Sequence, residues 1–157
     1  MLRAATLDDV ARLRAGIARI GRLSDNVLRL GRFGIGLDGL LAWVPAVGLL
    51  YSLGAGGYLL VQGWRARAPF GTLVFGLGLM GARSVVTAIG EGFLPFLPVE
   101  LLVDFFRAHK WTSDLLLRAI DETLYVEGPE DHANPAYLDM RADKVASRDR
   151  RRVVFLG

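Results

Sequence analysis

The sequence has no cysteine, and one long stretch of it has almost no ionisable residue. Without cysteine the chain forms no disulfide and has no thiolate metal ligand and no cysteine nucleophile. Residues 33–64 contain a single ionisable group, Asp38, whereas residues 1–32 carry seven arginines against three acids. Histidine occurs only at His109 and His132, which stand alone, so the sequence predicts no metal site and no cofactor.

The part of the sequence that is poor in charge consists of two long apolar runs, residues 33–64 and 69–106. Each is longer than the roughly 20 residues that cross about 30 Å of hydrocarbon, and basic segments flank them. They predict an all-α membrane protein, with a buried helix of a globular protein as the alternative. Residues 1–32 lack an early apolar block, so they are predicted to be a basic cytoplasmic arm and not a signal peptide.

The two runs contain copies of one unit. A shift of 42 residues aligns residues 33–66 with residues 75–108 without a gap, and 13 of the 34 aligned pairs are identical. Both units end in an aromatic residue followed by arginine, Trp64-Arg65 and Phe106-Arg107. The positive-inside rule then places the arm and both unit ends on the cytoplasmic side, so each unit is predicted to be a helical hairpin.

The turn of each hairpin is predicted near the middle of its unit, at Pro45 and Gly48 in the first and at Gly90 in the second. The limb before the first turn is about 18 Å long as a helix, which is too short to span a bilayer. Re-entrant hairpins are therefore one form of the prediction. One tilted span per unit and four short spans are the alternatives.

Basic and polar segments flank this duplicated domain, which we place at residues 33–122. In the arm, a basic amphipathic helix is expected over residues 7–23 with Thr6 as its N-cap. After residue 107 a helix is expected to continue to Gly128-Pro129. Residues 123–157 are predicted to be a polar, loosely ordered tail, in which residues 153–156 either add a short strand or dock elsewhere. Contacts with the anionic headgroups of a lipid bilayer, in place of nucleic acid, are predicted for the arginines Arg12, Arg19, Arg22, Arg65, Arg67 and Arg107.

Three ionisable residues, Asp38, Arg83 and Glu91, lie within the apolar runs. An uncompensated charge at the middle of a membrane costs at least about 2.5 to 3.5 kcal/mol, so each of them needs a partner or water. In the repeat register Asp38 and Arg83 are only three residues out of step, and we expect them to pair between the units. A structural ion pair is the simpler interpretation, and a transport or proton-relay role is the alternative.

Two glycine motifs, GIGLDG from residue 34 and GLGLMG from residue 76, match the dinucleotide fingerprint G-x-G-x-x-G. Neither follows a buried strand in a βαβ unit, which that fingerprint requires. Glycines at this spacing more simply let apolar helices approach closely. No serine, histidine and acid arrangement indicates nucleophilic catalysis, so no enzyme activity is predicted.

Two further stretches, SDNVLRLGRFGIGLDGLLAWVPAVG and DFFRAHKWTSDLL, carry a family resemblance. Through them, residues 23–120 resemble a bacterial membrane family known as domain-of-unknown-function family 4112. An acid is expected in that family after Val-Pro-x-Val-Gly, where this chain has Leu49. The resemblance implies a small membrane protein and brings no activity with it.

The sequence thus predicts a structural or accessory subunit of the bacterial inner membrane, with both termini cytoplasmic. Its glycine-rich faces are expected to form a homo-oligomer or to join a larger membrane complex. A small oligomeric ion channel or transporter that uses Asp38, Arg83 and Glu91 is the alternative function.

Overall fold

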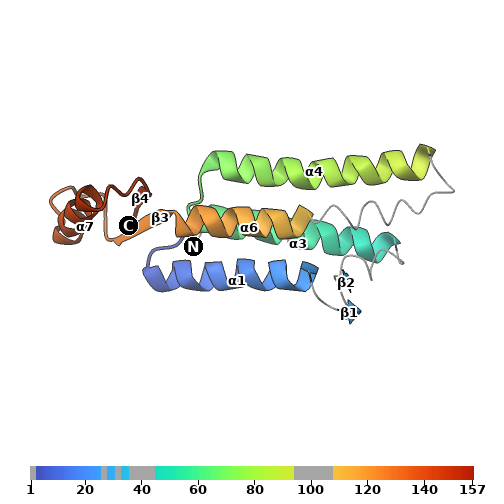
Figure 1. Ribbon diagram of the computed structural model, residues 1–157, viewed down its shortest axis with the longest axis horizontal. Coiled ribbons are helices and arrows are strands. Elements are labelled where there is room, and N and C mark those ends of the chain that lie inside the picture. Colours follow the sequence, from blue (N-terminus) through green and yellow to red (C-terminus); the bar gives the residue numbers. More distant parts are fainter. Residues whose placement is uncertain (1–2, 26–27, 31–32, 36–44, 94–107) are drawn as a thin grey trace.

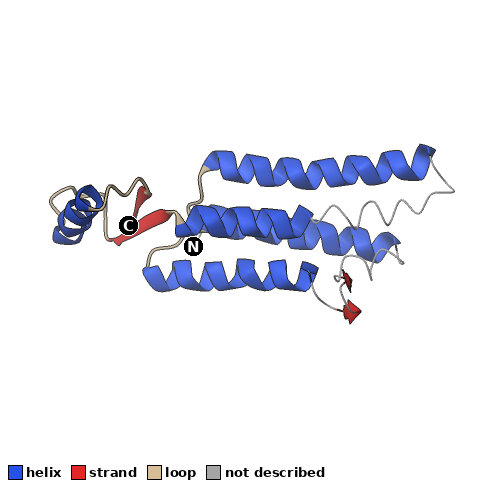
Figure 2. Cartoon of the chain, viewed as in Figure 1, coloured by secondary structure: helices blue, strands red, loops and turns tan. Residues whose placement is uncertain are grey.

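The structure, a computed structural model, describes residues 3–25, 28–30, 33–35, 45–93 and 108–157. In these residues, long helices lie side by side as a bundle, with a two-stranded sheet at each end (Figures 1 and 2). Helix α6 lies between α1 and α4 in the view of Figure 1 and also packs on α3. The bundle helices are α1 (Leu7–Asp25), α3 (Pro45–Arg65), α4 (Phe70–Phe93) and α6 (Ala108–Asp121).

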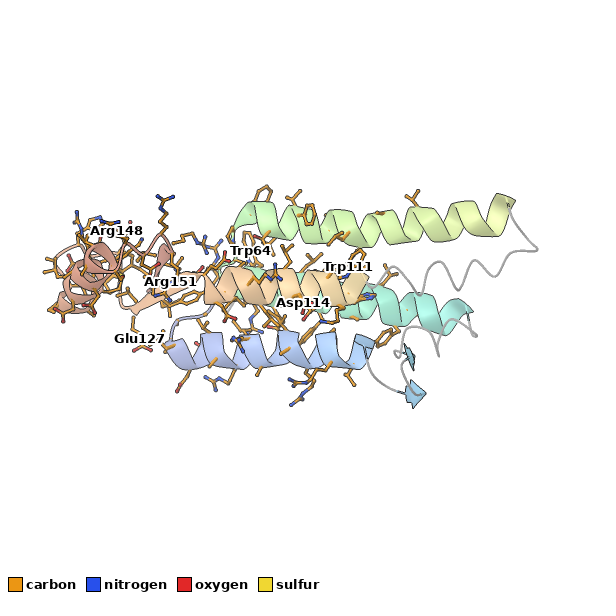
Figure 3. The ribbon with its side chains drawn as sticks, viewed as in Figure 1. Trp64, Trp111, Asp114, Glu127, Arg148 and Arg151 are labelled. Carbon is orange, nitrogen blue, oxygen red and sulfur yellow. The ribbon has the colours of Figure 1, made fainter. Side chains whose placement is uncertain are left out.

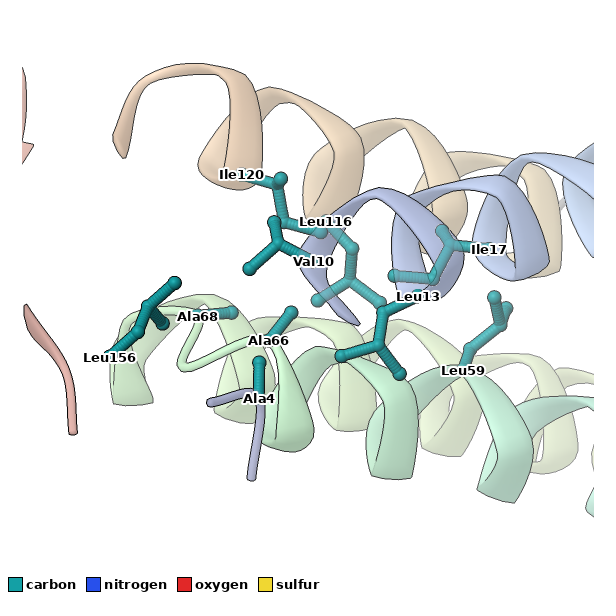
Figure 4. Close-up of a cluster of buried hydrophobic side chains, with 10 residues drawn as sticks. All are labelled: Ala4, Val10, Leu13, Ile17, Leu59, Ala66, Ala68, Leu116, Ile120 and Leu156. Atoms are coloured by element: carbon teal, nitrogen blue, oxygen red, sulfur yellow. The ribbon is translucent and has the colours of Figure 1, made fainter. Parts of the chain in front are cut away.

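Helix α1 confirms the amphipathic helix that was predicted in the arm. Thr6 caps it, because the Thr6 Oγ1 atom accepts a hydrogen bond from the Asp9 amide at 3.1 Å. Its apolar residues Val10, Leu13 and Ile17 recur at helical spacing and are buried. They form the core of the bundle together with residues of α3 and α6, as the close-up in Figure 4 shows: Leu59, Leu116 and Ile120.

Small residues let the bundle helices approach closely. A Cβ atom on Gly21 of α1 would lie 2.5 Å from Ser113 Oγ of α6. That hydroxyl donates a buried hydrogen bond to Ile17 O at 3.0 Å, which joins the two helices directly. A Cβ atom on Gly63 of α3 would likewise lie 2.6 Å from Leu116 Cδ2 of α6. Of the glycines in the second motif, for which close packing was predicted, Gly76 faces Thr112 of α6, whereas Gly78 and Gly81 face open space.

The C-terminal segment forms a small βαβ arrangement, in which β3 (Thr123–Glu127) and β4 (Arg152–Leu156) are parallel and α7 (Pro135–Ala146) connects them. Thr123 pairs with Arg152 and Glu127 with Leu156. The segment predicted to be loosely ordered thus contains regular elements, and the short strand proposed for residues 153–156 is confirmed.

The helix expected to reach Gly128 ends earlier, at Asp121. Thr123, Tyr125 and Val126 favour a strand, and β4 supplies the partner that this strand needs. The prediction of an unbroken helix is wrong because the pairing partner lies about 30 residues away, beyond the reach of local periodicity.

Helix α3 ends in a Schellman turn with an arginine where glycine is usual. The Arg67 amide donates to Trp64 O at 3.0 Å, and the Ala68 amide donates to Gly63 O at 2.9 Å. Arg67 has a φ of 56°, in the left-handed region that residues other than glycine and asparagine seldom adopt.

The side chain of Arg67 joins the two ends of the described chain at this turn. Its guanidinium donates hydrogen bonds to Ala4 O at 3.3 Å, to Gly157 O at 3.2 Å and to Phe155 O. The Ala4 amide adds a bond to Arg65 O at 2.8 Å. Three acceptors held by one side chain offset the cost of the left-handed backbone at Arg67.

The prediction of an inner-membrane protein with transmembrane helices is contradicted. Among the helices in the described ranges, none combines the length and the hydropathy that crossing a membrane requires. Helix α3 contains five glycines and α4 contains six, which lengthen a helix without adding apolar surface. Helix α4 also carries Arg83 and Glu91.

The tandem hairpins of the predicted fold class are also wrong where the structure describes them. Residues 33–35 form β2 (Phe33–Ile35), paired antiparallel with β1 (Leu28–Leu30), whereas the equivalent residues 75–77 lie inside α4. Pro45 is the first residue of α3, where its missing amide donor is not needed. Gly48 and Gly90 lie within α3 and α4 and not in turns.

Candidate functional surface on helices α3 and α4

One side of α3 is apolar and exposed. Its exposed residues recur at intervals of three and four along the helix, so they form one stripe. None of them is charged, and Leu50 leaves 70% of its surface open. The stripe consists of Leu50, Leu53, Gly54, Gly57, Tyr58, Val61 and Trp64.

Helix α4 carries a second stripe of the same kind, and it packs beside α3. Its most exposed side chain is Phe70, at 75%. The other described residues of the stripe are Gly71, Val74, Phe75, Leu77, Gly78, Gly81, Ala82 and Val85. We call the two stripes together the α3–α4 apolar face.

In both stripes, large side chains alternate with glycines that face open space. A Cβ atom placed on any of five glycines would find no other atom within 4 Å: Gly54, Gly57, Gly71, Gly78 and Gly81. By contrast, a Cβ on Gly76, on the inner side of α4, would lie 2.9 Å from Thr112 Cγ2. The open glycines therefore leave shallow gaps between projecting leucine, valine and phenylalanine side chains on the outer side of the bundle.

Charge lies elsewhere on the molecule. On the side of α1 and α6, Arg14 makes a two-pronged salt bridge to Asp121 at 2.8 and 2.9 Å. The hydrogen bond from Arg14 holds the pKa of the Asp121 carboxyl below its usual value, against a smaller opposing effect of burial. At the edge of the apolar face, the Arg3 guanidinium lies 4.6 Å from the centre of the Trp64 ring. Trp64 and Trp111 lie along the bundle, whereas Arg148 and Arg151 lie at its α7 end (Figure 3).

Two buried oxygen atoms lie beneath this face. Gln62 Oε1 on α3 and Thr112 Oγ1 on α6 have no hydrogen-bond partner in the described part of the chain. An unpaired buried polar atom costs about 1–3 kcal/mol, so these positions lower the stability of the α3–α6 packing. His109 is 1% exposed, and its ring centre lies 6.4 Å from that of Tyr51.

The residues predicted to act within the apolar runs are only partly placed. Asp38 and Arg107 lie outside the described residues. Arg83 and Glu91 are positions of α4, but their side chains are outside the description, so the predicted Asp38–Arg83 pair stays a prediction.

The arginines predicted to contact headgroups fall into two groups. Arg12, Arg19 and Arg22 are exposed on α1, and Arg12 also pairs with Asp9 at 2.9 Å. Arg65 and Arg67 are partly buried, and Arg67 is occupied by backbone carbonyls of the chain itself. In the described ranges no three side chains of His, Cys, Asp or Glu gather as a metal site.

Comparisons with protein-family models, with curated proteins and with solved structures found no match to this chain. The resemblance to family 4112 therefore stays a prediction. Within the described residues, ten of the fifteen exposed large hydrophobic side chains lie on the α3–α4 apolar face.

Proposed function

We propose that the protein is a structural subunit that assembles with further copies of itself through the α3–α4 apolar face. The observation that carries the proposal is the size of this uncharged surface. Ten large side chains of α3 and α4 are at least 40% exposed. Four of them are aromatic, at roughly 150–250 Å² for a whole side chain, and six are leucine or valine, at roughly 100 Å². At somewhat more than half exposure, the ten side chains present on the order of 800 Å² when summed over the two stripes.

That area exceeds the largest apolar patch of a typical monomer, which is about 300–600 Å². It is close to the about 800 Å² that each partner contributes to a standard protein interface. A surface of this kind is costly to leave in water, because burying it contributes about 25 cal/mol for each Å².

A second copy is the occupant that the shape favours. The face contains both projecting side chains, such as Leu53 and Leu77, and open gaps at Gly57 and Gly78. A twofold interface brings the same patch of two subunits together, so projections and gaps on one patch can complement each other. The absence of charge from the stripes removes the like-charge repulsion that would oppose such a pairing.

Size-exclusion chromatography with light scattering tests the proposal directly. The wild type should elute as a dimer or a higher closed oligomer. Leu77→Asp should shift it to the monomer, because Leu77 is 59% exposed and a buried carboxylate would lack a partner. Leu138→Asp is the matched control on α7, with 49% exposure outside the face, and should leave the assembly unchanged.

Two results would contradict the proposal. One is a wild type that stays monomeric at every concentration up to the limit of the measurement. The other is a monomer that binds uncharged lipid vesicles through Leu77, since the face would then have a different occupant.

A further inference from the structure

A cleft of about 840 Å³ lies between α7 and the turn that leads into β4. This volume is within the about 300–1,000 Å³ range of small-molecule sites. The residues that matter for its chemistry are His132, Tyr137, Arg141, Lys144, Arg148 and Arg150. We call it the α7–β4 cleft; it is separate from the α3–α4 apolar face.

The cleft is strongly cationic. It is lined by three arginines and one lysine but by a single acid, Asp149. That acid is already occupied, because Arg151 Nε donates to Asp149 Oδ2 at 2.6 Å. The same contact keeps the pKa of Asp149 low, so the carboxylate stays ionised and paired. The negative charge of Asp149 therefore compensates Arg151. The positive charges of Arg141, Arg148 and Arg150 stay available to a ligand.

Arg148 occupies a backbone position that favours glycine. Its amide donates to Val145 O at 3.3 Å and the Asp149 amide donates to Lys144 O at 2.9 Å, which is the Schellman turn also seen at Arg67. Its φ is 55°. At this position a residue with a Cβ atom adopts a costlier backbone conformation than glycine does.

Arg67 and Arg148 differ in the hydrogen bonds that their side chains make. Arg67 offsets the cost with hydrogen bonds to three carbonyl groups. The Arg148 guanidinium has no ion pair or hydrogen bond to any residue in the described ranges, and it lines the cleft. A costly backbone conformation that holds an unpartnered cation at a cleft is typical of a binding position.

The lining of the cleft also includes an aromatic side chain. This is Tyr137, whose ring centre lies 5.2 Å from that of His132 and 5.3 Å from that of Phe155. These contacts fix the Tyr137 ring in place. The cleft thus presents a rigid aromatic surface beside a group of free cations, an arrangement that suits a ligand with an aromatic part and an anionic part.

We propose that the α7–β4 cleft binds a small organic phosphate of the nucleoside polyphosphate class. Arg148 and Arg150 bind the phosphate groups, because a guanidinium matches two phosphate oxygens at once. The base lies beside the Tyr137 ring. Lys144 donates to Arg151 O, which closes the turn and holds these arginines at the rim of the cleft.

Isothermal titration of the purified protein with ATP, sodium tripolyphosphate and adenosine tests this proposal. ATP should bind with one site per chain, tripolyphosphate more weakly, and adenosine weakest of all. Tripolyphosphate binding as tightly as ATP would overturn the role of the Tyr137 ring. The absence of heat with both phosphate probes would overturn the site itself.

Arg148→Gly separates binding from folding, because glycine suits the backbone at this position. We expect it to weaken ATP binding at least about tenfold, the ratio that corresponds to one lost charged hydrogen bond. Arg19→Gln is the control, since it removes one exposed charge on α1, far from the cleft in sequence. Equal losses in both variants would mean that net charge alone attracts the probe, and the proposal would be wrong.

Discussion

Replacing Arg67 by glycine should destabilise the protein, whereas the same replacement at Arg148 should leave its stability unchanged or raise it. Both arginines have left-handed φ angles, 56° and 55°, in the same type of helix-terminating turn. Glycine removes a backbone cost of about 1–2 kcal/mol at either position. It returns about 0.5–1 kcal/mol to the unfolded chain as conformational freedom. The net gain at each turn is therefore about 0.5–1 kcal/mol.

The side chain decides the sign at Arg67. Its guanidinium bonds to Gly157 O and Ala4 O are long, at 3.2 and 3.3 Å, so they count for less than the bond to Phe155 O. One hydrogen bond from a charged group contributes about 1.5–3 kcal/mol, but the Nε atom of the same guanidinium is buried without a partner in the described residues, which opposes this gain. We therefore assign about 3 kcal/mol to the three bonds together. Arg67→Gly should then cost about 2 kcal/mol in the free energy of unfolding.

Thermal unfolding followed by circular dichroism measures the difference. For a chain of this size, about 2 kcal/mol lowers the Tm by roughly 4–8 °C. Arg148→Gly should show no decrease. If both variants shift the Tm in the same direction and by a similar amount, the side chain of Arg67 has no special structural role, and the reasoning about both turns is refuted.

Two further predictions concern packing and pH. Gly21→Ala should lower the free energy of unfolding by about 1–3 kcal/mol, because its Cβ would lie 2.5 Å from Ser113 Oγ. Gly54→Ala should raise it by about 0.5–1 kcal/mol, because the new Cβ would lie in open space. Equal effects of the two variants in urea unfolding would contradict this packing. Asp121→Asn should cost under about 1 kcal/mol at neutral pH, since the pair with Arg14 is half-exposed. Because the folded-state pKa of Asp121 lies below 3.8, the stabilisation exists above that pH and disappears in acid; a difference in Tm that persists in strong acid would exclude this origin.

The sequence predicts α1 well because the signals for this helix are local. Thr6, the acids of the first turn and the spacing of Val10, Leu13 and Ile17 all agree, and the structure contains each of them. The end of α6 is predicted poorly, because β3 exists only through its pairing with β4. No periodicity within Thr123–Glu127 reveals a partner so far along the chain.

The apolar runs are misread because their composition has two explanations. An apolar helix rich in glycine can pack in a bundle or lie in lipid, and composition alone does not separate these outcomes. In the described residues no helix has the length and the hydropathy of a membrane span. The α3–α4 apolar face could be predicted in part, because the spacing of glycines along a helix is enough to indicate a glycine-rich contact face. Which glycines face inward, such as Gly56 and Gly76, and which face open space depends on where α6 packs.

The α7–β4 cleft could not be predicted from the sequence. The cluster of basic residues at 141–152 is plain in the sequence, but it first indicates a solvated, charged segment. The conformation of Arg148 and the pairing of Asp149 with Arg151 depend on the turn after α7. Both features arise in the local turn that ends α7, and the sequence does not mark this turn because arginine stands where glycine is usual.

The hydrogen bonds of the Arg67 guanidinium also bear on which parts of the molecule unfold together. Ala4 lies near the start of the sequence and Phe155 near its end, yet both depend on one guanidinium at the end of α3. Separating β4 from β3 therefore loosens the entry into α1 in the same event. We therefore expect Ala4 and β4 to open together as one cooperative unit of local unfolding, although most of the fold lies between them in sequence.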